Sequence, residues 1–184
     1  VGEELKYVVG ARGSKLSMAQ TNWVISELKK VNSDCEYEIK PITTKGDTDT
    51  RPLFTIEQKG IFEKEIDKAV AAKEIDFAVH SLKDVPSELA DNLIIASIPK
   101  REKVNDVFIS SDDSSLDKIK PGSVIGTSSL RRAVQISRQR SDVTVKPIRG
   151  NIETRINKAS GENYDAIVLA QAGISRLGVD VNFT

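Results

Sequence analysis

Apolar residues recur along the chain with two different spacings, and the two spacings alternate from one end to the other. Short runs rich in β-branched residues predict strands at residues 7–10, 38–43, 76–80, 93–98, 107–110, 123–126, 143–148 and 166–170. Apolar positions three and four residues apart predict helices at residues 14–30, 60–73, 129–140, 151–159 and 172–177. Such alternation is typical of α/β proteins, in which helices cover mainly parallel sheets.

The charged segment 99–105 begins with a proline and separates two alternating halves, so we predict a linker there. We expect two lobes, residues 1–99 and residues 100–184, each with a mixed, mainly parallel sheet flanked by helices. Ligands bind such sheets beyond the carboxyl ends of the strands. In this chain those ends carry hydroxyls, cations and small residues that lead into helix N-termini, which attract carboxylates and phosphates. Two such edges facing each other across a cleft would suit a polyanion.

Composition narrows the class of protein. The chain has 184 residues, of which 39% are hydrophobic and 29% charged, and this favours a folded core over disorder. No apolar run reaches the ~18 residues of a membrane span, and residues 1–10 lack a signal-peptide layout, so we expect a cytoplasmic protein. A single cysteine, Cys35, argues against a disulfide framework or a cysteine zinc site, and a single histidine, His80, against His-rich metal sites.

The formal net charge is zero, but the basic residues are unevenly distributed. Seven of the ten arginines lie from Arg131 onward, and only Asp142 and Glu153 oppose the eight basic residues between Arg131 and Lys158. A local arginine cluster on a neutral protein favours a small anionic ligand over nucleic acid. No aromatic residue occurs from Ser110 to Asn163, so the cluster lacks a platform on which bases could stack.

Several segments of the chain read as motifs that occur in a fixed order. One is DFAVHSLKDVP at residues 76–86. The others are ARGSKLSMAQ from Ala11, TTKGD from Thr43, KGIFEKEI from Lys59, VIGTSSLRRAVQI from Val124, IRGNIETRI from Ile148 and YDAIVLAQAGISRLG from Tyr164. In this order they resemble the signature motifs of the porphobilinogen deaminases, of which the first is the most characteristic. The resemblance covers essentially the whole chain, and long motifs in a fixed order are far more specific than one short pattern.

The resemblance implies a hydroxymethylbilane synthase, a transferase of tetrapyrrole biosynthesis that joins four porphobilinogen units with release of ammonia. It implies two lobes like those of periplasmic binding proteins, and a third domain whose cysteine holds a dipyrromethane cofactor. No segment of this chain matches that third domain or the return segment of the first, and Cys35 does not match the attachment motif. We therefore expect the 184-residue chain alone to be inactive and to self-associate, although family members are usually monomeric.

The resemblance also implies roles for individual residues. Asp84 is the expected catalytic residue, a carboxylate that stabilises the positive charge that develops as ammonia leaves. The expected cofactor-binding residues are Ser81, Lys83, Thr127, Ser128, Ser129, Arg131, Arg132 and Gly150. The expected substrate-binding residues are Arg12, Ser14, Lys59, Arg149, Arg155 and Arg176. Arginine suits this task because each pyrrole carries acetate and propionate groups, which a guanidinium binds bidentately. No metal ion, nucleic acid or membrane is expected.

Simpler structural explanations stay open for many of these residues. The serines and threonines would equally cap helices, Lys59 would be a solvent lysine and Gly150 a turn glycine. The remaining candidates are assigned to structure: His80 as a hydrogen-bonded structural histidine, Trp23 and Phe62 as core, and Arg138 and Arg140 as a solvated helix face. Thr55, Glu57 and Gln58 depart from the family's pattern. For the whole protein, the alternative is a non-catalytic, two-lobed anion-binding protein.

Overall fold

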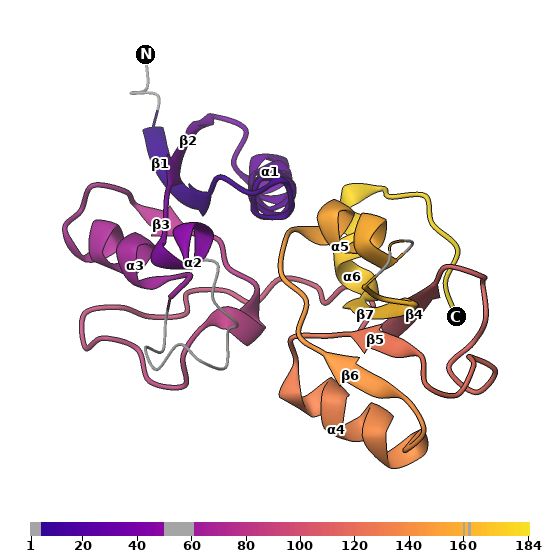
Figure 1. Cartoon of the computed structure of the whole chain (residues 1–184). Coiled ribbons are helices and arrows are strands. Elements are labelled where there is room, and N and C mark those ends of the chain that lie inside the picture. The colour runs from indigo at the N-terminus through magenta and orange to yellow at the C-terminus, as the bar shows by residue number, and fades with distance from the viewer. Residues whose placement is uncertain (1–4, 50–60, 160, 162) are drawn as a thin grey trace. The chain divides into compact units, whose positions relative to one another are not determined.

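The computed structural model describes residues 5–49, 61–159, 161 and 163–184 (Figure 1). Contacts divide these residues into two compact units, unit 1 up to Lys100 and unit 2 from Arg101 onward. The division falls inside the predicted linker 99–105. Thr55, Glu57, Gln58 and Lys59 lie outside the described residues.

Unit 1 contains a three-stranded sheet in the order β2-β1-β3. Its strands are β1 (Leu5–Arg12), β2 (Cys35–Ile42) and β3 (Phe77–Ala78). Both pairings are parallel, and β1 and β2 run together from Leu5↔Cys35 to Arg12↔Ile42. Parallel strands end at one edge of a sheet, so the ends of β1 and β3 lead into the same region.

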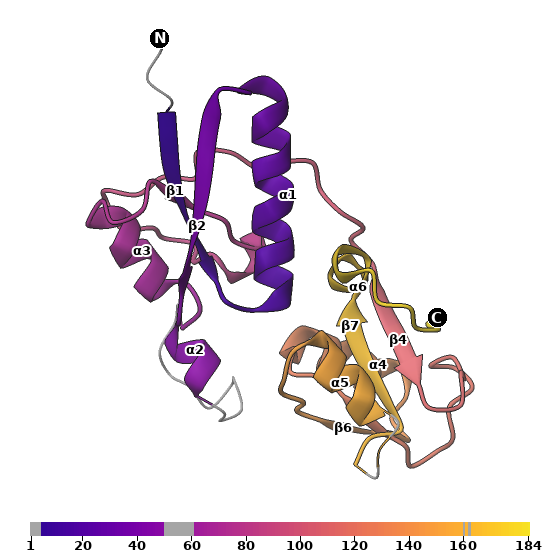
Figure 2. The same ribbon diagram turned by 90° about the horizontal axis from the view of Figure 1, so that it is seen from above.

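The helices of unit 1 are α1 (Lys15–Val31), α2 (Lys45–Thr48) and α3 (Lys64–Ala71), with a 3₁₀ turn at Leu82–Asp84. Figure 2 shows α1 on one side of the β1–β2 pair and α3 on the other. Ser14 caps α1 by accepting a hydrogen bond from the Ser17 N–H at 3.3 Å. Ile66 of α3 is fully buried and packs with Ile75, which anchors α3 against the sheet.

Unit 2 contains a four-stranded sheet in the order β4-β7-β5-β6. Its strands are β4 (Asp106–Ser110), β5 (Val124–Gly126), β6 (Thr144–Lys146) and β7 (Ala166–Ala170). β4 runs antiparallel to β7, and the other two pairings are parallel. Its helices are α4 (Leu130–Gln139), α5 (Ile152–Ala159) and α6 (Gln171–Leu177).

Alternating side chains of β4 and β7 fill two cores, one on each face of this sheet. Ile167 and Leu169 belong to the core that includes Ile174 of α6, whereas Ala166 and Val168 belong to the core that includes Ile136 of α4. A central strand covered on both faces reads as an unbroken apolar run, which explains the sequence AIVLA of β7.

The predicted α/β class with mainly parallel sheets flanked by helices is confirmed. Among the described residues, the sheet of unit 1 is wholly parallel rather than mixed. No helix in the described ranges is both long and apolar enough to cross a membrane.

The strands predicted at 76–80 and 143–148 are shorter in the structure, at Phe77–Ala78 and Thr144–Lys146. Two other predicted elements differ more strongly. Residues 93–98 form no strand, and within the described chain they pair with no other segment. A β-branched run becomes a strand only where a neighbouring strand supplies hydrogen bonds and a packing surface. Residues 60–73 were expected to form one helix, but α3 begins only at Lys64, and Phe62 lies in a turn before it.

The segment from Ile94 to Ile98 exposes its apolar side chains. Ile94 is 83% exposed, Ile95 49% and Ile98 67%. We expect this apolar surface to make the chain self-associate. Substituting threonine at Ile94 and Ile98 should lower the mean mass measured by light scattering at high concentration. The control is Val31→Thr at the end of α1, which is 76% exposed and should change the mass little. A monomeric wild-type chain at that concentration would contradict the prediction.

Candidate functional site

A hollow in unit 1 lies where β1 and β3 end. It is lined by Arg12, Ser14, Leu16, Ser17, Gln20, Phe62, Val79, His80, Ser81 and Asp84. Four of these were predicted as site residues: Arg12, Ser14, Ser81 and Asp84. The parallel strands thus bring together residues that are more than 60 positions apart in the sequence. Lys83 is exposed and adjoins Asp84 in the chain.

Asp84 is held by the 3₁₀ turn, in which its N–H donates to the Ser81 carbonyl at 2.9 Å. Its side chain is half-buried, and burial raises the pKa of the Asp84 carboxyl. The positive charges of Lys83 and Arg12, and of His80 when protonated, oppose this rise in pKa. A carboxylate that has lost part of its hydration interacts more strongly with a cation than a carboxylate in bulk water.

Arg12 is fixed from two sides. Its Nε donates to Asp47 Oδ1 at 3.1 Å, its Nη2 pairs with the same oxygen, and its guanidinium carbon lies 4.2 Å from the centre of the Phe62 ring. Asp47 Oδ2 accepts hydrogen bonds from the N–H and the Oγ1 of Thr44, at 3.0 and 2.8 Å. These contacts hold the guanidinium in one orientation at the hollow.

The sequence interpretation missed Asp47, although a signal for it was present. Thr44 and Asp47 have the spacing of a capping box, and the structure forms that box at the start of α2. Burial alone would raise the pKa of Asp47, but hydrogen bonds from Arg12 and Thr44 hold it below its usual value. The α2 turn therefore presents a fully charged partner to Arg12.

The prediction that Phe62 and Trp23 belong to the core is wrong. Phe62 is half-buried in the hollow beneath Arg12, and Trp23 is 37% exposed. Gly46 explains the position of Phe62, because a Cβ at Gly46 would lie 2.2 Å from the aromatic ring. The apolar spacing could not distinguish a core aromatic from one that supports a guanidinium.

Gln20 is a further residue that sequence reasoning missed. It is 8% exposed, and its amide contacts the Ser81 hydroxyl, with Nε2 and Oε1 at 3.0 and 3.1 Å from Oγ. Gln20 is the last residue of the motif ARGSKLSMAQ. Its burial could not be predicted from that motif, because a polar residue in a helix is ordinarily exposed. The contact links α1 to the turn that carries Asp84.

Behind Asp84 lies a second set of ionisable groups. His80 Nε2 lies 3.9 Å from Asp67 Oδ1 of α3. Among the described residues this nitrogen is buried without a hydrogen-bond partner, so the structure supplies none of the hydrogen bonding expected of His80 at this atom. Burial lowers the pKa of His80, whereas Asp67 and Asp84 raise it, and the Arg12 charge lowers it. Burial also raises the pKa of Glu63 and of Asp67.

In unit 2, Asp106 at the start of β4 joins two arginines of α4. Its Oδ2 lies 2.8 Å from Arg131 Nη2, and its Oδ1 lies 2.6 Å from Arg132 Nη2. Arg132 Nη1 also donates to the Val168 carbonyl at 3.4 Å, while Nε is buried with no partner in the described part of the chain. Asp106 was not predicted, because nothing in the sequence pairs a strand-start aspartate with a helix 25 residues later.

Arg155 is the centre of a positively charged region. Its Nε donates to the Gly150 carbonyl at 2.7 Å. Burial lowers the pKa of Arg155, and the charges of Arg149 and Arg132 lower it further. The predicted residues Arg132 and Arg149 therefore lie close enough to Arg155 to repel it electrostatically. A bound anion would relieve this repulsion. Arg176 lies in the last turn of α6.

Gly150 has a backbone conformation that favours glycine. Its φ is +121°, and a Cβ would lie 2.8 Å from Thr154 Cγ2. Any side chain would therefore disturb the carbonyl that orients Arg155.

The predicted hydroxyls of unit 2 are engaged with the backbone. Ser129 caps α4 by accepting from the Arg132 N–H at 3.4 Å, and Thr127 Oγ1 accepts from the Ser129 N–H at 3.2 Å. Ser128 Oγ donates to the Ile148 carbonyl and accepts from the Ile148 N–H. These residues position the start of α4, which carries Arg131 and Arg132.

Arg138 and Arg140, which the sequence assigned to a solvated helix face, differ in their surroundings. Arg138 is exposed, as expected. The prediction that Arg140 also belongs to a solvated face is wrong: its guanidinium pairs with Asp142 at 2.8 Å and donates to the Leu116 and Ile119 carbonyls at 2.6 and 2.8 Å. A spacing pattern cannot show that a chain carbonyl lies within reach of an arginine.

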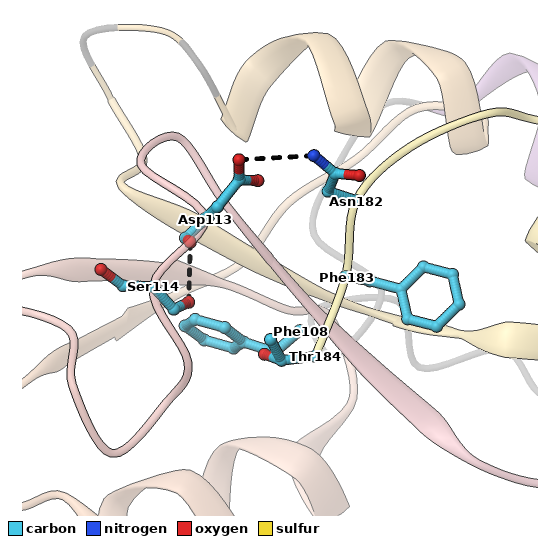
Figure 3. A pocket seen from close by; sticks show the side chains of 7 residues that line it. Phe108, Asp113, Ser114, Asn182, Phe183 and Thr184 are labelled. Carbon is cyan, nitrogen blue, oxygen red and sulfur yellow. Dashed lines mark hydrogen bonds between the residues drawn. The ribbon is translucent and has the colours of Figure 1, made fainter.

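Another hollow, of about 270 Å³, lies in unit 2, and no predicted site residue lines it. Figure 3 shows Asp113 and Asn182, whose side chains lie 3.4 Å apart, together with Phe108, Phe183 and Thr184. Thr184 and Phe108 exchange two backbone hydrogen bonds, at 2.8 and 3.0 Å. Across the described ranges, no group of three or more histidine, cysteine, aspartate or glutamate side chains is arranged to hold a metal ion.

A comparison with protein families matches residues 7–184 to the family described as "Porphobilinogen deaminase, dipyromethane cofactor binding domain". The chain belongs to the porphobilinogen deaminase family. This confirms the resemblance drawn from the sequence motifs, including the expectation of a dipyrromethane cofactor.

Curated relatives agree with this assignment. The chain is 82% identical over 180 residues to a probable porphobilinogen deaminase of Nitrosopumilus maritimus, a match that covers 98% of the chain and 58% of the relative. It is 52% identical over 174 residues to a porphobilinogen deaminase of Listeria monocytogenes, covering 94% of the chain and 56% of that relative. The chain thus spans somewhat more than half the length of these relatives.

Two binding proteins are among the solved structures that align with this chain. One is an ancestral arginine-binding protein bound to arginine, with 16% identity, a TM-score of 0.47, and coverage of 97% of this chain and 79% of that one. The other is the second substrate-binding domain of Lactococcus lactis GlnP in an open conformation, with 12% identity, a TM-score of 0.49, and coverage of 100% and 76%.

The Asp106 contacts lead to a prediction about pH. Burial alone would raise the pKa of Asp106, but hydrogen bonds from Arg132 and Arg131 hold it below its usual value. Replacing Asp106 by asparagine should destabilise the chain at pH 7 by about 1.5–3 kcal/mol, as for other lost hydrogen bonds to charged groups. The stabilisation by Asp106 is present above the ordinary aspartate pKa of about 3.9 and is lost as the pH falls through the depressed value.

The difference in Tm between wild type and Asp106→Asn should therefore be large at pH 7 and narrow in strongly acidic buffer. Melting curves followed by circular dichroism measure it, with the exposed Asp180→Asn as the matched control. A Tm difference that stays the same at both pH values would show that the ion pairs do not contribute as described.

Proposed function

We propose that this chain is the part of a hydroxymethylbilane synthase that binds substrate and cofactor, and that the whole protein joins four porphobilinogen units with release of ammonia. The observation that carries the proposal is the Asp84 carboxylate, half-buried in the hollow that Arg12 also lines. Membership of the porphobilinogen deaminase family supports the choice of substrate and of reaction. Its location in the cytoplasm remains a prediction.

Asp84 is proposed to be the catalytic residue. When ammonia leaves porphobilinogen, positive charge develops on the pyrrole, and the carboxylate stabilises that charge. Partial burial strengthens this interaction, because less water competes for the carboxylate. The turn that holds Asp84 is linked to α1 through Ser81 and Gln20, so the carboxylate need not reorganise as charge appears.

Arg12 is proposed to bind the carboxylates of the substrate. Asp47 and Phe62 fix its guanidinium, which lowers the entropy lost when a ligand binds. Ser14 contributes the N-terminus of α1, where unpaired N–H groups also favour an anion. The proposed role of Lys59 in substrate binding rests on its sequence motif.

The residues of unit 2 fit a cofactor that carries several carboxylates. Arg132 has a buried Nε without a partner in the described ranges, and Arg149 and Arg155 add positive charge around it. We propose that Arg131, Arg132, Lys83 and the hydroxyl residues Ser81, Thr127, Ser128 and Ser129 hold the cofactor. Gly150 orients Arg155 beside it, and Arg149, Arg155 and Arg176 bind the growing chain. When bound, dipyrromethane supplies the primer to which substrate units are added.

The alternative of a non-catalytic anion-binding protein is less favoured. The arginines would suit it, but the Asp84 carboxylate in the same hollow as Arg12 would repel an anion. A carboxylate in this position serves a step in which positive charge forms.

The first test replaces Asp84 in a full-length polypeptide, one that contains this chain and is as long as its curated relatives. Asp84→Asn should keep the fold and lose about 10²–10³ in rate, because a neutral amide cannot balance the developing cation. Asp84→Glu keeps the charge but displaces it, so it should be impaired less than the asparagine variant. Single-turnover ammonia release and Tm are measured for both variants and for Asp84→Ala.

A purely structural Asp84 would produce a different pattern. If it only stabilised the turn, asparagine would be well tolerated, and alanine would cost about 1 kcal/mol of stability, as at a helix cap. Ammonia release near the wild-type rate in Asp84→Asn would eliminate the catalytic assignment.

The second test concerns the cofactor. In the same full-length polypeptide, replacing both Arg131 and Arg132 by leucine should abolish assembly of the dipyrromethane-bound form, measured by intact mass. The matched control is Arg138→Leu, which removes an exposed arginine from the same helix. A normal mass increment in the double variant would refute the proposed role of the two arginines.

A further inference from the structure

His80 is a buried ionisable group to which the proposed reaction assigns no role. Its side chain is 15% exposed, it lines the same hollow as Asp84, and its Nε2 has no hydrogen-bond partner within the part of the chain that the structure describes. Asp67 Oδ1 of α3 lies 3.9 Å from that nitrogen. A buried polar atom without a partner is uncommon in a folded protein and calls for an explanation.

The groups that face His80 come from each element packed around it. Asp67 belongs to α3, Asp84 to the 3₁₀ turn and Arg12 to the end of β1, and all three act on the charge of the imidazole. Glu63, just before α3, is coupled in turn to Asp67 and Asp84. Lys83 beside Asp84 is exposed and acts on that carboxylate. The imidazole thus shares its surroundings with the proposed catalytic group.

We propose that His80, backed by Asp67, is a positioning residue that sets the net charge around Asp84. The neutral imidazole leaves the negative charge of Asp84 available to a substrate cation. Protonation at Nε2 would place a positive charge against Asp67 and within electrostatic reach of Asp84, which would offset the catalytic carboxylate. This inference rests on the function proposed above for Asp84.

The local energetics favour the neutral form at neutral pH. Burial disfavours the imidazolium and lowers the pKa of His80 below its ordinary value, while Asp67 and Asp84 limit that fall. The carboxylates therefore determine how acidic the solution must become before the histidine gains its proton. Removing either one should make protonation harder.

The test is an NMR titration of the imidazole of His80. This chain has a single histidine, so its imidazole signal is assigned without ambiguity. In wild type the midpoint of the titration should lie below the ordinary histidine value of about 6.5. Asp67→Asn and Asp84→Asn should each move the midpoint to lower pH, by about half a pH unit or more. The matched control, Asp91→Asn, removes an exposed carboxylate of the same unit and should leave the midpoint in place.

A second measurement connects the titration to the reaction. In the full-length polypeptide, the acid limb of the kcat/KM profile should contain a step at the midpoint seen by NMR. His80→Gln should remove this step, because glutamine does not titrate, and Asp67→Asn should move the step by the shift found in the NMR titration. If His80 had only a packing role, its replacement by glutamine would lower activity equally at every pH.

The results separate this inference from the proposed function. The NMR titration requires no turnover. If the midpoints are as expected but the full-length polypeptide releases no ammonia, the proposed function is contradicted and the electrostatic coupling stays in place. Midpoints unchanged in both aspartate variants, or a wild-type midpoint at or above the ordinary value, would overturn the inference. An active His80→Gln polypeptide that keeps the acid step would overturn it as well. The two aspartates lie on different elements, so the titration stays decisive if one variant fails to fold.

Discussion

Partial removal of water from charged groups is the constraint on which both candidate sites depend. In unit 1 burial raises the pKa of the Asp84 carboxyl, and in unit 2 it lowers the pKa of Arg155. Burying a charge is unfavourable unless a partner compensates it. The surroundings of both groups compensate only in part, so each site retains an affinity for a charge that a ligand can supply.

Fixed partners hold the other charged groups in place. The capping box of α2 holds Asp47, Asp47 holds Arg12, and Phe62 lies against the guanidinium because Gly46 leaves room for the ring. In unit 2, Asp106 holds the side chains of Arg131 and Arg132. These contacts reduce the number of side-chain conformations that a ligand must order, which is a general route to preorganised sites.

The two units supply different charges to the chemistry that we propose. The hollow of unit 1 combines a cation, Arg12, with the Asp84 carboxylate, so in our proposal it accepts both the acid groups of a pyrrole and the positive charge that forms on it. The arginine region of unit 2 is suited to anions.

The sequence by itself determined the α/β class, the family and most of the elements, because these depend on periodic apolar patterns and on motifs that are local in the chain. The motifs also supplied Asp84, Arg12 and Arg132 as candidates, because the family resemblance matches these positions one by one. Only the tertiary structure decided that residues 93–98 form no strand, that Phe62 supports Arg12, and that Asp47, Gln20, Asp106 and Asp67 belong to the candidate sites. Each of these facts depends on contacts between segments distant in the sequence, and such contacts leave no periodic signal in the chain.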